Sequence, residues 1–213
     1  MVCLQKNQGQ AETKRGVKVN TILSEKQGKY VEERSKFLSF CFAVFSKDEV
    51  TKNLSNIKGK HPSCRHICYA YRIFDKDLIE RSCEDGEPSG TAGSQILQLL
   101  KENDVINTLC IVVRYFGGVK LGTANLGRAY KEAARQTLTE NLTQVELKTL
   151  YKGLCDYPLF SQIKQECGKR KIKFENVSYD NNIKFEVYLS DENYLWLKGI
   201  VPLEITDKMQ YSC

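Results

Sequence analysis

The sequence predicts two mixed α/β (α+β) domains, because apolar strand-like runs alternate with helical periodicity along the whole chain. Its 213 residues, 41% hydrophobic and 27% charged, are enough for two cores of ordinary size. A long helical segment ends and a new strand can begin near residues 142–150, where we expect the domain boundary. We therefore assign residues 1–16 to a flexible tail, 17–143 to an N-terminal domain and 147–213 to a C-terminal domain.

In the N-terminal domain, each element is predicted from periodicity and from the residues that bound it. Gly28 lies between the first two strand-like runs and predicts a turn there, and Ser46 can cap the helix that follows them. The expected elements are strands at 17–23 and 36–45, a helix at 48–57, strands at 65–74 and 77–82, a helix at 91–102, a strand at 105–116 and a helix at 123–141.

The C-terminal domain is expected to follow the order β-α-β-β-α-β, which is the ferredoxin-like pattern. Pro158 opens the first helix, and Asp180-Asn181-Asn182 form the turn of a hairpin. Tyr179, Phe185 and Tyr188 resemble sheet aromatics that stack on RNA bases, but no RNP-type signature is present, so packing is the favoured role. The expected elements are a strand at 149–157, a helix at 159–169, strands at 172–179 and 183–189, a helix at 191–199 and a strand at 203–210.

The segment 109–141 carries the first candidate site. An apolar strand, Leu109 to Val113, leads into a loop with Gly117, Gly118 and Gly122 around Lys120, and a helix begins near Thr123. Free N–H groups and the helix dipole favour a phosphate or carboxylate at such a helix start. The alternative is that the glycines only turn a strand tightly into a helix.

Known phosphate-binding motifs do not fit this loop. Gly117 and Gly122 have the separation of a P-loop, but Thr123 stands where its lysine belongs, and no Gly-x-Gly-x-x-Gly occurs. The sequence therefore gives no motif support for binding of ATP or NAD, and we expect no cofactor.

A second glycine-bearing segment, residues 81–93, precedes the helix at 91–102, and Ser89 or Thr91 can cap that helix. Two such helix entries in one domain suggest that both loops meet on one surface. Three carboxylates in this segment, Glu84, Asp85 and Glu87, are candidate metal ligands, acid/base groups or partners of Arg114 and Lys120. A solvated acidic turn that complements the helix dipole is the favoured reading.

The cysteine spacing and the charge distribution bear on whether the chain has a metal site or a nucleic-acid-binding surface. The nine cysteines contain no Cys-x-x-Cys pair, and Cys64 and Cys68 on one strand lie about 13 Å apart, too far to share a zinc ion. We expect reduced core thiols and no metal site. The net charge is +6, and residues 150–213 hold nine basic and nine acidic side chains, so the excess lies before residue 150. A nucleic-acid surface requires that excess to be clustered.

Four sequence motifs occur in an order that resembles the YigZ/IMPACT family. The resemblance rests on these motifs over about residues 20–140 and on the order of the predicted elements in the rest of the chain. The motifs are His61-Pro62, Arg65-His66-Ile67-Cys68-Tyr69-Ala70-Tyr71, Glu84-Asp85-Gly86-Glu87-Pro88-Ser89-Gly90-Thr91-Ala92-Gly93 and Val113-Arg114-Tyr115-Phe116-Gly117-Gly118-Val119-Lys120-Leu121-Gly122-Thr123.

The resemblance implies a ribosomal protein S5 domain 2-like N-terminal domain and a ferredoxin-like C-terminal domain, a pair similar to domains IV and V of elongation factor G. It implies that the related eukaryotic IMPACT protein regulates translation by competing for the activator of an initiation-factor kinase. For bacterial members, nucleic-acid binding is inferred from the fold by analogy. Ala124-Asn125 stand here where relatives tend to have Gly-Gly, so a Cβ now limits how closely a ligand approaches the backbone.

The leading hypothesis is a non-enzymatic, translation-linked cytoplasmic protein that binds RNA, the ribosome or a protein partner in translation control. No apolar run approaches the length of a membrane span, and the first 20 residues are too polar for a secretory signal. The residues expected to bind the anion are Arg65, His66, Arg114, Tyr115, Gly117, Gly118, Lys120, Gly122, Thr123 and Arg128.

Two alternatives come from other classes of protein. An enzyme acting on an anionic small molecule would use Asp85 and Glu87 to hold a metal or move protons, opposite Lys120 and Arg114. A regulatory module that binds another protein would instead expose an apolar patch and show little sensitivity to salt.

Overall fold

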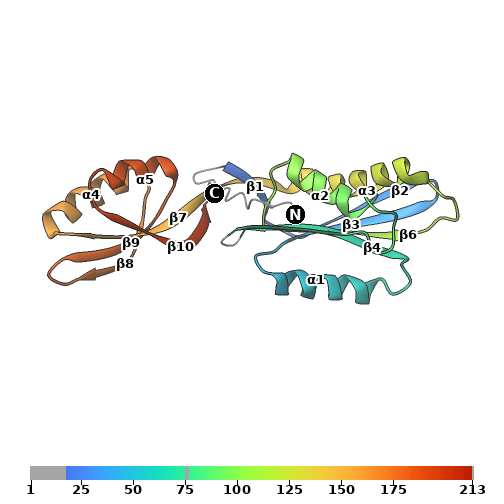
Figure 1. Ribbon diagram of the computed structural model, residues 1–213, viewed down its shortest axis with the longest axis horizontal. Coiled ribbons are helices and arrows are strands. Elements are labelled where there is room, and N and C mark those ends of the chain that lie inside the picture. The colour runs from blue at the N-terminus through green and yellow to red at the C-terminus, as the bar shows by residue number, and fades with distance from the viewer. Residues whose placement is uncertain (1–17, 75–76, 213) are drawn as a thin grey trace, which may run out of the picture. The chain divides into compact units, whose positions relative to one another are not determined.

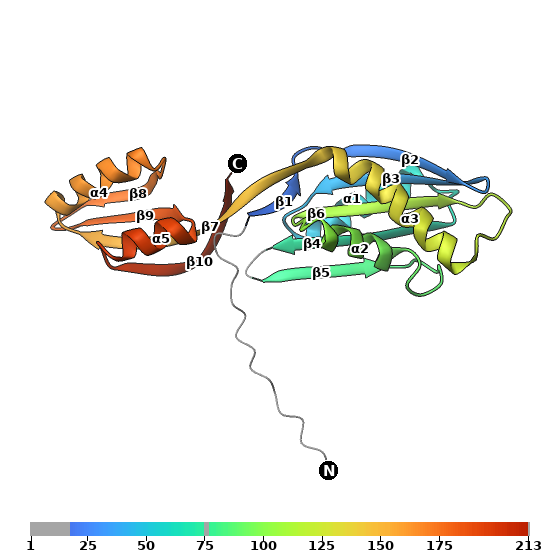
Figure 2. The ribbon, with the colours of Figure 1, turned by 90° about the horizontal axis from the view of Figure 1, so that it is seen from above.

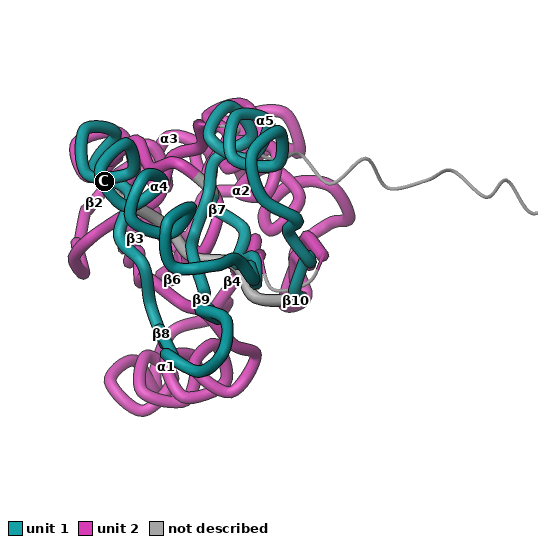
Figure 3. The backbone as a smooth tube through the Cα atoms, turned by 90° about the vertical axis from the view of Figure 1, so that its left-hand side faces the viewer, with its two compact units in different colours: residues 1–17, 147–210 teal, residues 18–146, 211–213 magenta. Residues whose placement is uncertain are grey.

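The computed structural model describes residues 18–74 and 77–212. Within them the chain forms two compact units, residues 18–146 and residues 147–210 (Figure 3). The first unit contains β1 (Lys18–Ile22), β2 (Lys26–Glu32), β3 (Ser35–Ala43), α1 (Lys47–Lys60), β4 (His66–Phe74), β5 (Leu78–Cys83), α2 (Gly93–Glu102), β6 (Thr108–Tyr115), α3 (Gly122–Leu138), the short 3-10 helix η1 (Thr139–Asn141) and the start of β7 (Leu142–Cys155).

An antiparallel sheet in the order β2-β3-β6-β4-β5 forms the centre of the first unit. Helices α2 and α3 cover one face and α1 covers the other (Figure 1). The central strand β6 is therefore buried on both faces, and Leu109 to Val113 are all inaccessible to solvent. Burial on both faces explains why this strand is a continuous apolar run instead of an alternating one.

One strand of this sheet was missed by the sequence prediction. Gly28, expected in a turn, lies inside β2, and the turn falls instead at Glu33 and Arg34, which both have positive φ angles. The strand is polar and lies at the edge of the sheet, so it lacks a hydrophobic run. A Cβ on Gly28 would come within 2.8 Å of the Ser39 hydroxyl oxygen and 2.9 Å of the Thr137 methyl carbon, so close packing requires the glycine.

The cap predicted for the first helix is confirmed. The Ser46 hydroxyl oxygen accepts a hydrogen bond of 3.2 Å from the N–H of Glu49, at the start of α1. The cysteines expected in the core, Cys41, Cys68 and Cys110, are buried there as free thiols.

The second unit holds the rest of β7 followed by α4 (Tyr157–Lys169), β8 (Phe174–Tyr179), β9 (Ile183–Leu189), α5 (Asp191–Lys198) and β10 (Leu203–Ser212). This is the predicted order of elements, and α4 and α5 cover one face of the strands (Figure 1). Strand β7 begins earlier than predicted, at Leu142, because residues 142–146 pair with β1 while residues 149–155 pair with β9.

The aromatic side chains of this unit take different positions. Phe185 is 2% exposed and packs in the core over Gly153, where a Cβ would lie 2.2 Å from its ring. Tyr188 is partly buried, whereas Tyr179 is 58% exposed beside Tyr157. Packing is therefore the role of Phe185.

No helix within the described part of the chain is long and apolar enough to cross a membrane.

Candidate functional site

The two glycine-bearing loops meet at one end of the first unit, as the sequence predicts. Loop 84–92 precedes α2 and loop 116–121 precedes α3, and both lie at the same end of the sheet, with α2 and α3 side by side (Figure 2). Between them is a pocket of about 410 Å³. Its lining residues are Arg65, His66, Gly86, Glu87, Pro88, Arg114, Phe116, Lys120, Leu121, Gly122, Thr123 and Leu126.

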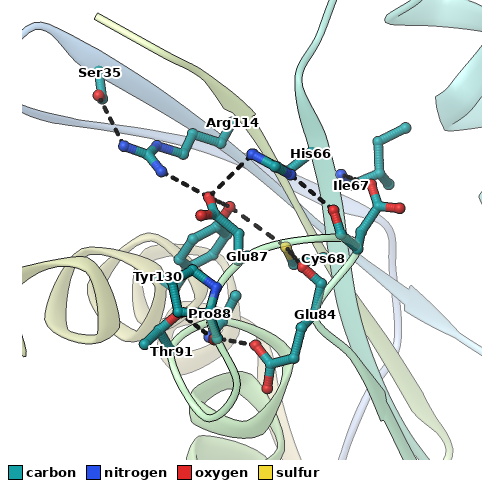
Figure 4. A network of polar contacts seen from close by, with 12 residues as sticks. Ser35, His66, Ile67, Cys68, Glu84, Glu87, Pro88, Thr91, Arg114 and Tyr130 are labelled. Atoms are coloured by element: carbon teal, nitrogen blue, oxygen red, sulfur yellow. Dashed lines mark hydrogen bonds and ion pairs between the residues drawn. The ribbon is translucent and has the colours of Figure 1, made fainter. Parts of the chain in front are cut away.

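A buried ion pair forms the inner wall of this pocket (Figure 4). Arg114 donates from Nη1 to Oε1 of Glu87 at 2.7 Å, and the two side chains are only 7% and 5% exposed. The Tyr130 hydroxyl donates to the same oxygen at 2.8 Å. Charges removed from water at this depth persist only when they are paired and hydrogen-bonded. Arg114 and Glu87 are therefore first of all structural partners.

The rest of the Arg114 guanidinium is held by neighbours on two elements. Nη2 donates to the Ser35 hydroxyl oxygen at 3.5 Å, and that oxygen also accepts from the Gly117 N–H at 3.2 Å. The guanidinium carbon lies 5.5 Å from the ring centroids of both Phe37 and Phe116. Nε is buried and has no hydrogen-bond partner among the described residues. Through the Ser35 hydroxyl, Arg114 thus links the pocket wall to Gly117 in loop 116–121.

Two further side chains complete the buried network around Glu87. Burial, and then the neighbouring Cys68 and Glu87, raise the pKa of Tyr130, so this hydroxyl remains protonated and donates its proton. Burial likewise raises the pKa of Cys68, whose thiol lies 3.0 Å from the Glu84 carbonyl oxygen. A thiol that stays protonated is a poor nucleophile, so Cys68 serves as a core thiol, as predicted.

His66 connects the acidic loop to β4. Its Nδ1 lies 2.7 Å from the carbonyl oxygen of Asp85, which can only accept, so Nδ1 carries the proton. Its Nε2 faces Glu87 Oε1 at 3.8 Å. The Asp85 carboxylate accepts a 2.6 Å bond from the Ile67 N–H, which fixes the loop against the start of β4.

The start of α2 is filled by a carboxylate from the preceding loop. The Glu84 carboxylate accepts hydrogen bonds from the N–H groups of Gly90 (3.2 Å), Ala92 (2.7 Å), Gly93 (3.0 Å) and Ser94 (3.0 Å) and from the Ser94 hydroxyl (2.6 Å). Although burial raises the pKa of this carboxyl, the Ser94, Ala92 and Gly90 donors outweigh it and hold the pKa below its ordinary value. Glu84 is therefore the cap of α2 and sits where an external anion would bind.

The cap predicted for α2 from the sequence is wrong. The N-cap position is Ala92, and the Thr91 hydroxyl donates instead to the Pro88 carbonyl at 2.6 Å. A glutamate eight residues before the N-cap escapes local capping rules, which look for Ser, Thr, Asp or Asn at the helix start.

The start of α3 differs from that of α2. Its N-cap is Leu121, no side chain within the described residues caps it, and its first turn holds no acidic residue. In the first turn, Ala124 and Asn125 are both exposed, and the Asn125 amide donates to the Leu121 carbonyl at 3.2 Å. Neither side chain closes the helix start, which opens towards the pocket at Gly122 and Thr123.

The glycines of this loop have separate structural reasons. Gly118 and Gly122 have φ angles of 86° and 73°, which favour glycine. A Cβ on Gly117 would lie 2.2 Å from the Arg34 carbonyl carbon, so the β2–β3 turn leaves no room for one. Local geometry thus explains all three glycines, and Gly122 alone among them lines the pocket.

Besides Gly117 and Gly118, two of the residues predicted to bind the anion do not line the pocket. Tyr115 follows Arg114 on β6 and so points to the opposite face of the sheet, where its hydroxyl lies 2.9 Å from Nδ1 of His61. Arg128 is exposed on α3 and pairs with Glu32 at 3.2 Å. The structure gathers the remaining predicted side chains, Arg65, His66, Arg114, Lys120 and Thr123, around the pocket.

The acidic residues do not form a common site. Glu87 faces Arg114, Asp85 faces the Ile67 N–H, and Glu84 faces the start of α2. Among the described residues there is no group of three or more His, Cys, Asp or Glu side chains placed to hold a metal ion. The enzyme hypothesis requires Asp85 and Glu87 to be available, and both are engaged by internal partners.

Comparisons with known proteins agree with the motif pattern. The family model of the Impact N-terminal domain matches residues 33–138. The IMPACT family member YvyE of Bacillus subtilis (strain 168) is 31% identical over 173 residues, covering 81% of this chain and 80% of the relative. The IMPACT family member YigZ of Escherichia coli (strain K12) is 30% identical over 164 residues, covering 75% and 80%. The chain belongs to the IMPACT family, as its motifs predict.

A solved structure extends the similarity over most of the fold. A crystal structure described as that of an hypothetical protein matches with a TM-score of 0.60 and 24% identity, and covers 87% of this chain and 96% of that chain. The two proteins therefore share a mixed α/β fold across both units.

Proposed function

We propose that this protein is a regulator linked to translation that binds RNA through the pocket between loops 84–92 and 116–121. Membership of the IMPACT family supports the link to translation, because the motif resemblance implies that the related eukaryotic protein regulates translation. The observation that carries the RNA-binding part is the pairing of exposed cations with an uncapped helix start at one pocket.

The charges around the pocket favour an anionic ligand. Arg65 and Lys120 are exposed, and neither forms an ion pair with a described residue. The carboxylate in the lining, Glu87, is already neutralised by Arg114. The N–H groups at the start of α3 add partial positive charge. The pocket therefore presents unbalanced positive charge to a phosphate.

The proposal assigns different roles to the residues that were predicted to bind the anion. Arg65 and Lys120 make the phosphate contacts in this proposal, Arg114 supports the pocket wall, and Arg128 and Tyr115 lie outside it. Replacing Arg114 would leave Glu87 buried and unpaired, so an Arg114 variant cannot separate binding from folding.

Binding of fluorescent single-stranded RNA across a salt series tests the proposal. The logarithm of affinity should fall linearly with the logarithm of salt concentration, and Lys120→Ala should weaken binding and reduce that slope by about 0.7 to 1. Lys58→Ala, on α1 at the other face of the sheet, removes the same charge away from the pocket and should leave binding unchanged. Equal losses in the two variants, or no binding at low salt, would refute the proposed site.

The resemblance to the IMPACT family also implies a specific fold for each unit, and we include these two assignments in the proposal. The first unit is taken as ribosomal protein S5 domain 2-like and the second as ferredoxin-like. The spatial order β10-β7-β9-β8 with both helices on one face supports the second assignment.

A further inference from the structure

The pocket has a buried inner wall and an exposed rim. The buried residues Glu87, Arg114, Leu121 and Leu126 form the inner part. Exposed lining residues from both loops form the rim. A volume of about 410 Å³ lies in the range of small-molecule sites and is suited to one nucleotide.

The charge of the lining matches a dianion. Arg65, Lys120 and Arg114 are cationic and Glu87 is anionic, so these four groups sum to about two positive charges. A terminal phosphomonoester carries about −1.5 to −2 at pH 7 and offers three acceptor oxygens, whereas an internal phosphodiester carries only one charge. Arg114 is held by Glu87 and Ser35, so Arg65 and Lys120 are the lining cations left to contact the phosphate oxygens.

An aromatic side chain stands at the rim of the same pocket. Phe116 is 43% exposed, and the Arg114 guanidinium lies over its ring at 5.5 Å from the centroid. The exposed remainder of the ring is available to a base, and stacking of this kind is tolerant of base identity. Pro88 adds apolar surface from the opposite loop.

We infer that the pocket binds a nucleotide bearing a terminal phosphomonoester, so that the protein recognises a phosphorylated RNA end. The phosphate lies at the start of α3 beside Lys120 and Arg65, and the base packs against Phe116. This inference rests on the proposed function and specifies the ligand of the same site.

Fluorescence anisotropy with eight-nucleotide RNAs of one sequence tests the inference in the full-length protein. The RNAs end in a 5′-phosphate, a 5′-hydroxyl or a 3′-phosphate, with the label at the other end. A phosphorylated end should bind about tenfold more tightly than the hydroxyl form. Unlabelled adenosine 5′-monophosphate serves as competitor, and should displace the phosphorylated RNA only at higher concentration than the unlabelled RNA itself.

Two variants separate the parts of the ligand. Lys120→Ala should abolish the preference for the phosphorylated end. Phe116→Leu keeps the apolar contact and removes the stacking ring, so it should weaken binding of phosphorylated RNA about tenfold while keeping the phosphate preference. Thermal melting of each variant, beside Lys58→Ala, verifies that the fold is intact.

The outcomes distinguish the inference from the proposed function. Equal binding of phosphorylated and hydroxyl RNA, lost in Lys120→Ala, would overturn end recognition and leave the RNA-binding proposal standing. Binding of neither RNA would overturn both. Displacement by the mononucleotide as effective as by RNA would overturn the RNA end in favour of a free nucleotide.

Discussion

Helices α2 and α3 of the first unit begin in similar ways and end up with opposite roles at their N-termini. Both follow a loop with glycines, and both pack on the same face of the sheet. The start of α2 is occupied by the Glu84 carboxylate, which accepts bonds from its first N–H groups. The start of α3 has no such group within the described residues and opens on the pocket.

The difference between the two helix starts shows that a glycine-containing loop before a helix can have either a structural or a ligand-binding role. An N-terminus attracts an anion by its free N–H groups and its dipole. When the chain supplies that anion itself, the loop stabilises the fold. When it does not, the same geometry is left for a ligand. One carboxylate, Glu84, thus distinguishes the two helix starts.

The largest effect is expected from the buried ion pair of Arg114 and Glu87 in the pocket wall. Arg114→Ala leaves Glu87 buried without its partner and should lower the free energy of unfolding by about 3–5 kcal/mol. Urea denaturation measures this loss. Combining Arg114→Met with Glu87→Gln removes both charges and should recover much of it. If the single and double variants lose equally, the ion pair is not the source of the effect.

The next largest effect on stability is expected at the start of α2, which the Glu84 carboxylate caps. Glu84→Ala removes the acceptor of several N–H groups and should destabilise the protein by about 2 kcal/mol in urea denaturation. RNA binding at the other helix should change little in the folded protein. As a control, Glu175→Ala on exposed β8 should cost less than about 0.5 kcal/mol. A Glu84 variant as stable as this control would contradict the capping role.

The closed start also predicts a dependence of stability on pH. The folded-state pKa of Glu84 lies below its ordinary value of 4.5, so its contribution is full above that value and is lost as pH falls through the lower, folded-state pKa. Glu32, Glu80 and Glu102 share this direction. Unfolding free energies measured from pH 6 downwards should therefore fall, and Glu84→Gln should make that fall shallower. An unchanged pH profile in Glu84→Gln would remove Glu84 from the account.

The smallest effect on stability comes from closing the open start of α3. Ala124→Asp places a carboxylate in the first turn and should stabilise the helix by about 0.3–1 kcal/mol. The same charge should reduce RNA affinity, because it competes for the N–H groups that the phosphate needs. Ala124→Ser adds a polar side chain without charge and serves as the matched variant. Equal RNA affinity in Ala124→Asp and the unmodified protein would place the binding site elsewhere.

Local periodicity predicted most of the elements, and the prediction that the two glycine-bearing loops meet on one surface is confirmed. The pairing of Arg114 with Glu87 was one of the predicted alternatives, but the burial of the pair and its contact with Ser35 were not, because they arise only when distant segments meet in the fold. The same holds for Glu84, whose capping role depends on the path of the loop. The placement of Tyr115 was accessible from the sequence: neighbouring residues on a strand face opposite sides, so Arg114 and Tyr115 could not share a surface.

The most direct test of an anion site at the start of α3 is a backbone amide titration by NMR with phosphorylated RNA. We predict saturable shifts at the amides of Gly122, Thr123 and Ala124, with those of Ala92, Gly93 and Ser94 unmoved because Glu84 already occupies them. Shifts confined to the start of α2, or to neither helix start while RNA binds, would contradict the claim that the open N-terminus of α3 is the anion site.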